Sequence, residues 1–397
     1  MGFFKKKTKG PLYTVELGSA SDFVHAYKDQ KNSMPTNNVV LISSNNRLLK
    51  EKCLVPTIKR GTSSFVIYDD GIVDSGVFNA LKARGYDVQV IDFADQTHKS
   101  RIDVFEMVNI TKNTFWTAEI FANELLDIQE EKRLIVQQLL KAMLDMMVEH
   151  QQTVTIKRLW ELFRAICANN QMIINEMMKY VDFESAYPMC KDDNDLLKNI
   201  EETIMFTSMS FCNNPNVYGI TSLNRNMAFI FRNATKNYRH ITTLFMANLN
   251  MLSSISGNGH ITTVVFDKYD VDWYDRSVLQ KIEKSTMMSF DKHVVNVKIK
   301  KTIDENDQQA PLIIYMLSDD EKTIETIHSY ITLNALFTEE EKQELSKKHF
   351  KKKPLPESVL NDAPFTIEQL KEFNGFITID TSKKTKPFLM GKVQESE

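Results

Sequence analysis

A strand, a helix and a second strand follow one another between residues 63 and 93, and this order constrains the fold more than any other feature. The segments "SSFVIYD" and "YDVQVIDF" are short runs rich in β-branched and aromatic residues, as in buried parallel strands. Between them, "VFNALKARG" has the pattern of a helix that ends before Gly85, because glycine commonly follows a helix. Two strands joined by such a helix lie parallel in one sheet. The unit therefore predicts an α/β fold, a doubly wound sheet with helices on both faces.

Further strand signals flank a long region that has none. One strand, "NVVLI", precedes the unit, and five follow residue 226: "MAFIF", "ITTVVFD", "HVVNVKI", "PLIIYML" and "GFITID". Between about residues 115 and 209, apolar side chains recur at helical spacing, for example Ile156, Leu159 and Phe163. An all-α insertion therefore interrupts the predicted sheet. The expected organisation is an N-terminal extension (1–37), an α/β domain (38–112 and 215–397) and an all-α insertion domain (113–214).

Composition excludes several classes of protein. A chain of 397 residues with 42% hydrophobic and 25% charged residues is large enough for two globular domains. A net charge of −3 gives no general attraction to nucleic acid. The four cysteines are widely scattered, which argues against a zinc site or a disulfide framework. No apolar run approaches the roughly 18 residues that span a bilayer. We therefore expect a soluble, cytoplasmic protein.

The first strand leads into a turn that contains no glycine. In "NVVLISSNNRLLKEKCLVP", a buried strand is followed by a polar stretch and a helix, which is where a nucleotide-binding protein places its phosphate loop. Such a loop needs glycines so that backbone N–H groups can turn toward phosphate. It also needs a lysine for the β- and γ-phosphates and a Ser or Thr hydroxyl for magnesium. The stretch is therefore either an altered phosphate loop or an ordinary β-to-α turn.

The order of the segments resembles the conjugative coupling ATPases of type IV secretion systems, the TraG/TraD type. Residues 38–70 can be laid without a gap on the family's first strand, phosphate loop, helix and second strand. Later segments are similar in the same order: "ARGYDVQVIDF", "KSRIDVF", "FWTAEIFANELL", "NMAFIFRNATKNYRHITTLFMANLNML", "ITTVVFDK", "PLIIYMLSDDEKTIETIHSYITLNALF" and "FNGFITIDTSKKTKPFL". The resemblance implies a RecA-like, mostly parallel sheet interrupted by an all-α domain. The family usually carries N-terminal membrane helices, which have no counterpart in this sequence.

The resemblance also locates the residues that would perform the chemistry, and most of them are replaced. The family's Gly-x-x-x-x-Gly-Lys-Thr falls on the stretch that begins at Ser43 and includes Asn46. Leu48 takes the place of the second glycine, Leu49 that of the lysine and Lys50 that of the magnesium-binding hydroxyl. Shifting the alignment by one residue places Lys50 on the lysine, but Glu51 then replaces the hydroxyl and repels phosphate.

Two acidic motifs of the family are altered as well. Asp69, which ends the second strand, begins an Asp-Asp-Gly-Ile stretch where the family has Asp-Pro-Lys-Gly. Asp267 keeps the carboxylate that supports magnesium, but Lys268 replaces the carboxylate that polarises water. The resemblance therefore implies a pseudo-ATPase with no catalytic residue, metal or cofactor. ATP and Mg²⁺ enter only in the alternative, an active DNA-transfer ATPase with an atypical phosphate loop.

The predicted role is that of a degenerate coupling-protein-like pseudo-ATPase in conjugative transfer that acts through protein contacts. Its expected partners are conjugation or secretion machinery proteins, with an active ATPase paralogue among the candidates, in an assembly that could be oligomeric. Its expected location is the cytoplasm, extending to the inner face of the membrane. A third hypothesis is a nucleic-acid-binding module in which Lys347–Lys353 contact DNA phosphates. A solvated linker is the ordinary interpretation of that run. The acidic residues Asp267, Asp270, Asp272 and Asp275 could suggest a divalent-cation site, but a solvated acidic loop is the favoured interpretation.

Overall fold

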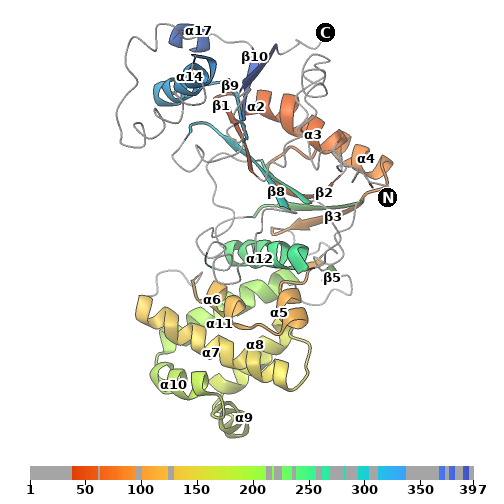
Figure 1. The fold of residues 1–397 in the computed structure, drawn as a ribbon. Coiled ribbons are helices and arrows are strands. Elements are labelled where there is room, and N and C mark those ends of the chain that lie inside the picture. Colours follow the sequence, from red (N-terminus) through yellow and green to blue (C-terminus); the bar gives the residue numbers. More distant parts are fainter. Residues whose placement is uncertain are drawn as a thin grey trace, which may run out of the picture.

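A computed structural model gives the fold of the protein (Figure 1). It describes residues 38–60, 63–94, 101–123, 129–211, 217–218, 226–234, 238–255, 262–267, 281, 294–303, 312–336, 366–371, 375–380 and 388–392. Several of the sequence predictions concern parts of the chain outside these residues: the N-terminal extension, Lys268, the acidic residues Asp270, Asp272 and Asp275, and the run Lys347–Lys353.

Nine strands form one sheet in the order β11-β10-β9-β1-β8-β7-β2-β6-β3. Neighbouring strands from β9 to β3 are parallel, and β10 pairs antiparallel with both of its neighbours, β9 and β11. The bounds are β1 Asn38–Ser43, β2 Ser64–Asp69, β3 Asp87–Asp92, β6 Met227–Arg232, β7 Thr262–Phe266, β8 Val294–Lys300, β9 Leu312–Leu317, β10 Gly375–Asp380 and β11 Phe388–Lys392. Every strand predicted from the sequence is present, which confirms the mostly parallel α/β sheet. Strand β11 was not predicted.

Helices cover both faces of the sheet because side chains alternate along each strand. Phe65 and Ile67 of β2 belong to the core on one face, which also includes residues of the helices that follow β1 and of α4 (Ser75–Ala83). Val66 and Tyr68 belong to the core on the other face, under α12 (Arg239–Ile255). The remaining helices of this part are α2 (Asn46–Leu49), η1 (Lys50–Leu54), α3 (Val55–Arg60), α14 (Glu321–Leu336) and α17 (Ile367–Lys371).

The predicted β-α-β unit forms as the sequence indicates. Asp74 caps the start of helix α4: its side chain accepts a hydrogen bond of 2.7 Å from Val77 N and so satisfies one of the unpaired N–H groups at a helix start. It ends before Gly85, whose φ of 79° is the left-handed conformation that glycine adopts without strain. Strands β2 and β3 lie on either side of β6 and parallel to it.

A helical bundle stands between β3 and β6 in the chain. It consists of α5 (Glu106–Thr111), α6 (Phe115–Asn123), α7 (Glu130–Glu149), α8 (Ile156–Cys167), α9 (Gln171–Met177), α10 (Val181–Cys190) and α11 (Asn194–Phe211). A short parallel pair, β4 (Arg101–Ile102) and β5 (Val217–Tyr218), joins the segments by which the chain enters and leaves the bundle. The predicted all-helical stretch is therefore confirmed. Within the described ranges, no helix is long and apolar enough to cross a membrane.

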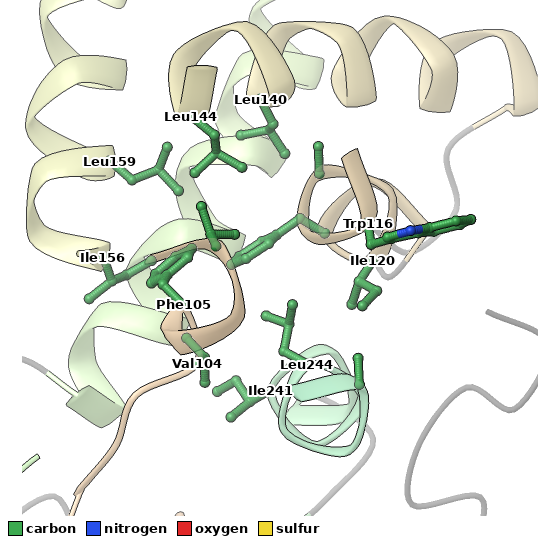
Figure 2. Close-up of a cluster of buried hydrophobic side chains, with 14 of the residues drawn as sticks. Val104, Phe105, Trp116, Ile120, Leu140, Leu144, Ile156, Leu159, Ile241 and Leu244 are labelled. Carbon is green, nitrogen blue, oxygen red and sulfur yellow. The ribbon is translucent and has the colours of Figure 1, made fainter. Parts of the chain in front are cut away.

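The bundle and the sheet share one hydrophobic core through α12. Phe105, before α5, lies among apolar side chains of the bundle, and Ile241 and Leu244 of α12 face it from below (Figure 2). From α12, Phe245 reaches the sheet and meets Phe231 of β6 edge-on at a centroid distance of 4.9 Å. All five side chains are buried. The core therefore runs without a break from the sheet into the bundle.

Candidate functional site

The candidate site lies at the carboxyl ends of β1, β2 and β7, the edge where open α/β sheets bind their ligands. Ser43 is the last residue of β1, Asp69 is the last residue of β2, and Asp267 follows β7 directly. In the sheet, β2 and β7 are neighbours, and only β8 lies between β7 and β1. The residues that the sequence places far apart are thereby brought to one edge.

The turn after β1 has no room for a phosphate loop. Helix α2 begins at Asn46, so only Ser44 and Asn45 separate it from the strand. The turn is closed internally, because Asn45 N donates to Ser43 Oγ at 3.0 Å and Leu49 N donates to Asn45 O at 3.3 Å. A phosphate loop instead leaves several consecutive N–H groups free to converge on an anion. Here the backbone becomes helical before such a group of donors can form.

The residues aligned with the family's second glycine and lysine belong to this helix. Leu48 and Leu49 end α2. The Leu49 side chain is fully buried and belongs to the core beneath the helix, with Leu54 and Ile58. An apolar side chain packed in the core cannot contact the phosphates that a lysine would bind.

A π-helical turn, η1, places Lys50 at the site. Val55 N donates to Lys50 O across this turn, and the turn ends just before Pro56, which has no N–H with which to continue the regular helical pattern. The Lys50 ammonium lies 3.0 Å from Asp267 Oδ1 and donates to Asp70 O at 2.9 Å. Lys50 thus connects the segments that follow β1, β2 and β7.

Asp267 is fixed from both sides of its carboxyl group. Its side chain is 0% exposed, and Oδ2 accepts hydrogen bonds from Asp70 N at 3.0 Å and Ile72 N at 2.9 Å. Burial raises the pKa of this carboxyl to about 6, because the loss of hydration outweighs the opposing effect of Lys50 and of the two N–H donors. At neutral pH the group is therefore mostly ionised, and its contact with Lys50 is an ion pair.

Asp69 organises the turn that supplies those N–H groups. Its Oδ1 accepts hydrogen bonds from Gly71 N at 3.0 Å and Val73 N at 2.9 Å, and its Oδ2 pairs with Arg232 Nε at 2.8 Å. Gly71 has a φ of 99°, which suits glycine. Arg232 was not among the predicted site residues, although it directly follows the predicted strand "MAFIF" and pairs in register with Asp69.

The structure thus brings three of the predicted residues, Lys50, Asp69 and Asp267, into one group. Ser43, Asn46 and Leu49 lie nearby in the chain but outside this group. Lys50 and Asp267 pair directly, and Asp69 holds the turn that binds Asp267. Ser43 and the partly buried Asn46 lie in the β1–α2 turn and helix start, beside the buried Leu49. In the parts of the chain that the structure describes, no three His, Cys, Asp or Glu residues are grouped as metal ligands.

These residues do not fit a nucleotide with Mg²⁺. In the ungapped alignment, a buried leucine takes the place of the phosphate-binding lysine, and an ammonium that already neutralises Asp267 takes the place of the magnesium-binding hydroxyl. In the alignment shifted by one residue, Lys50 takes the place of the lysine but is paired with Asp267, and Glu51 takes the place of the hydroxyl. A second cation beside Asp267 would be repelled by Lys50.

Comparisons with known proteins find similarity in structure. No family model matches the sequence, and no curated protein matches it. The bacterial conjugative coupling protein TrwBdeltaN70, in its unbound form, superposes with a TM-score of 0.53 at 11% identity, covering 91% of this chain and 85% of that chain. The plasmid coupling protein TrwB in complex with ADP and Mg²⁺ gives a TM-score of 0.53 at 10% identity, covering 97% and 94% of the two chains. The resemblance inferred from the sequence is thus confirmed for the fold: the chain has the fold of the conjugative coupling protein TrwB, a parallel α/β sheet with an all-helical stretch.

Proposed function

We propose that this protein is a pseudo-ATPase of the coupling-protein type, which serves conjugative transfer through protein contacts and does not hydrolyse ATP. Two things support the proposal: the fold shared with TrwB over nearly the whole chain, and a site whose residues do not suit a nucleotide. The expected partners are conjugation or secretion machinery proteins, with an intact ATPase of the same fold among the candidates.

The observation that carries the proposal is the start of α2 at Asn46. A substitution of the glycines alone could leave an unusual but open loop. Here the segment that would enclose the phosphates is helical, and its Leu49 is packed in the core. Restoring one side chain would therefore not restore a phosphate loop.

Apolar side chains on the bundle support a role in protein contacts. Among the described residues, the large hydrophobic side chains that are exposed all belong to the bundle: Ile110, Phe115, Leu134, Met172, Val181, Met189 and Met205. The three most exposed are Met172 and Val181 at 75% and Met189 at 66%. They lie on α9 and α10, at the end of the bundle away from the sheet (Figure 1). Exposed apolar surface of this kind commonly marks a protein interface.

A nucleotide titration tests the loss of ATP chemistry. We expect no ATP binding by calorimetry up to about 1 mM ligand, with or without Mg²⁺, because the loop donors, the lysine and the hydroxyl are all replaced. A coupling ATPase with an intact phosphate loop, measured in the same buffer, serves as the positive control. Micromolar affinity for ATP would refute the proposal and favour the alternative of an active ATPase with an atypical loop.

A surface variant tests the role in protein contacts. We expect the triple variant Met172→Gln, Val181→Gln, Met189→Gln to bind the co-expressed transfer proteins at least about tenfold more weakly than the native chain, since central apolar contacts dominate interface energies. Binding is measured by co-purification followed by titration with the isolated partner. The exposed pair Lys157→Gln, Glu161→Gln on α8 is the matched control and should bind normally. Unchanged binding by the triple variant would show that this end of the bundle is not the contact surface.

A further inference from the structure

We infer that the Lys50 ammonium occupies the place that a divalent cation has in a working nucleotide site of this fold, so that the site holds a permanent internal cation. The inference deepens the proposed function and rests on the alignment used there, in which Lys50 takes the place of the magnesium-binding hydroxyl and Asp267 that of the magnesium-supporting carboxylate. The structure adds that these two side chains meet at 3.0 Å.

The contacts of the ammonium are those that a small cation would make. Divalent cations such as Mg²⁺ bind oxygen ligands and commonly take one or two carboxylates, with water completing the shell. Lys50 Nζ lies against two oxygens, Asp267 Oδ1 at 3.0 Å and Asp70 O at 2.9 Å. These oxygens come from the ends of two different strands, β7 and β2. The ammonium therefore joins the same parts of the sheet that a bound cation would join.

The surroundings of Asp267 show that its Oδ1 atom needs a positively charged partner. Its Oδ2 is satisfied by the N–H groups of Asp70 and Ile72. Its Oδ1 is buried and receives no well-formed hydrogen bond from the described residues, so the Lys50 ammonium is its neutralising contact among them. An ionised carboxylate without a counter-charge is costly in a buried site. If Lys50 were removed, the site would offer two oxygens and one uncompensated negative charge.

The inference predicts how the protein binds divalent cations. The native chain should bind none beside Asp267, because the Lys50 ammonium already occupies that position. A variant that lacks the ammonium should accept one. Mn²⁺ is the probe, because it prefers the same oxygen ligands as Mg²⁺. The concentration of unbound Mn²⁺ can be measured by electron paramagnetic resonance.

The test compares the native protein, Lys50→Ala and the double variant Lys50→Ala, Asp267→Ala. We expect Mn²⁺ to bind one site in Lys50→Ala and to raise its Tm by about 2 °C at a tenfold excess over Kd. The native protein and the double variant should show neither effect. Lys157→Ala is the matched control, because it also removes a lysine paired with a carboxylate, Glu161, but both side chains are exposed. It should gain no Mn²⁺ site.

A second variant covers the case in which Lys50→Ala does not fold. Lys50→Gln removes the charge but keeps more of the lysine side chain than alanine does, and its amide oxygen can face a cation, so it should gain the same site. The inference is overturned if a folded Lys50 variant binds no more Mn²⁺ than the double variant. It is also overturned if the native protein already binds Mn²⁺ through Asp267. Neither result bears on ATP binding by the native chain, so the proposed function stands or falls separately by its own titration.

Discussion

Replacing Asp267 by asparagine is expected to destabilise the protein by about 2–4 kcal/mol, because it leaves the ammonium of Lys50 without its counter-charge at a mostly buried site. The Lys50 side chain is 18% exposed, so part of the lost interaction can be recovered by water, which places the effect below that of a fully buried pair. The asparagine oxygen can still accept from Asp70 N and Ile72 N. The loss therefore reports the ion pair and not the turn, and urea unfolding followed by circular dichroism measures it.

The double variant Lys50→Met, Asp267→Asn measures how much of this loss comes from the interaction between the two charges. Removing both charges should cost roughly 1–2 kcal/mol less than Asp267→Asn, since replacing a buried ion pair as a whole is often nearly neutral. The exposed pair Arg47 and Glu51, at 2.7 Å on the same segment, is the control. Substituting Glu51→Gln should cost less than about 1 kcal/mol. An Asp267→Asn variant as stable as the native protein would show that the two charges do not interact in solution.

Truncating Phe105 to alanine is expected to cost about 3–5 kcal/mol, the usual loss for a large aromatic side chain removed from a packed core. Phe105 is 2% exposed, and its ring stacks on Phe121 with the centroids 6.1 Å apart. The cavity would lie where the bundle meets α12. The free energy of unfolding, measured with urea by circular dichroism, should fall in a single transition because one core serves both parts.

Phe115→Ala is the matched control for that prediction. Phe115 is 40% exposed and contacts Trp116 edge-on at 4.8 Å, so its loss should cost less than about 1.5 kcal/mol. If Phe105→Ala instead produced two separate transitions, the bundle would unfold by itself and the core would not couple it to the sheet. A loss no larger than that of Phe115→Ala would mean that the Phe105 side chain is not packed as described.

The fold was largely predictable because its signals are local and strongly periodic. Strands of the sheet centre, such as β2 with its buried Phe65 to Tyr68, are short runs whose side chains are buried on both faces of the sheet. The helical stretch is equally clear, since Leu159, Phe163 and Ile166 recur on the buried side of α8. Strand β11 escaped prediction because it is a run of only five residues, FLMGK, and its glycine weakens the strand signal. The order of strands in the sheet is a long-range property that no local pattern specifies.

The site was predictable only in part. The absence of glycine after β1 indicated that the loop had changed, and the alignment singled out Lys50 and Asp267. Their ion pair was not predicted, because it depends on the π-helical turn at Lys50–Leu54, which aims the lysine across the strand ends. The role of Arg232 was missed for a similar reason: only the pairing of β2 with β6 brings it to Asp69. Both interactions arise from tertiary structure, which composition and spacing do not encode.

The core shared through α12 has a mechanical consequence. A domain joined to its neighbour by a thin polar contact can swing when a partner pulls on it. Here the bundle is attached by the adjacent strands β3 and β6 and is also packed against α12 along a continuous apolar interior. Bending between the two parts would open that interior to water. We therefore expect the bundle and the sheet to move as one rigid body. A force that a partner applies at α9 and α10 would then be transmitted to the sheet.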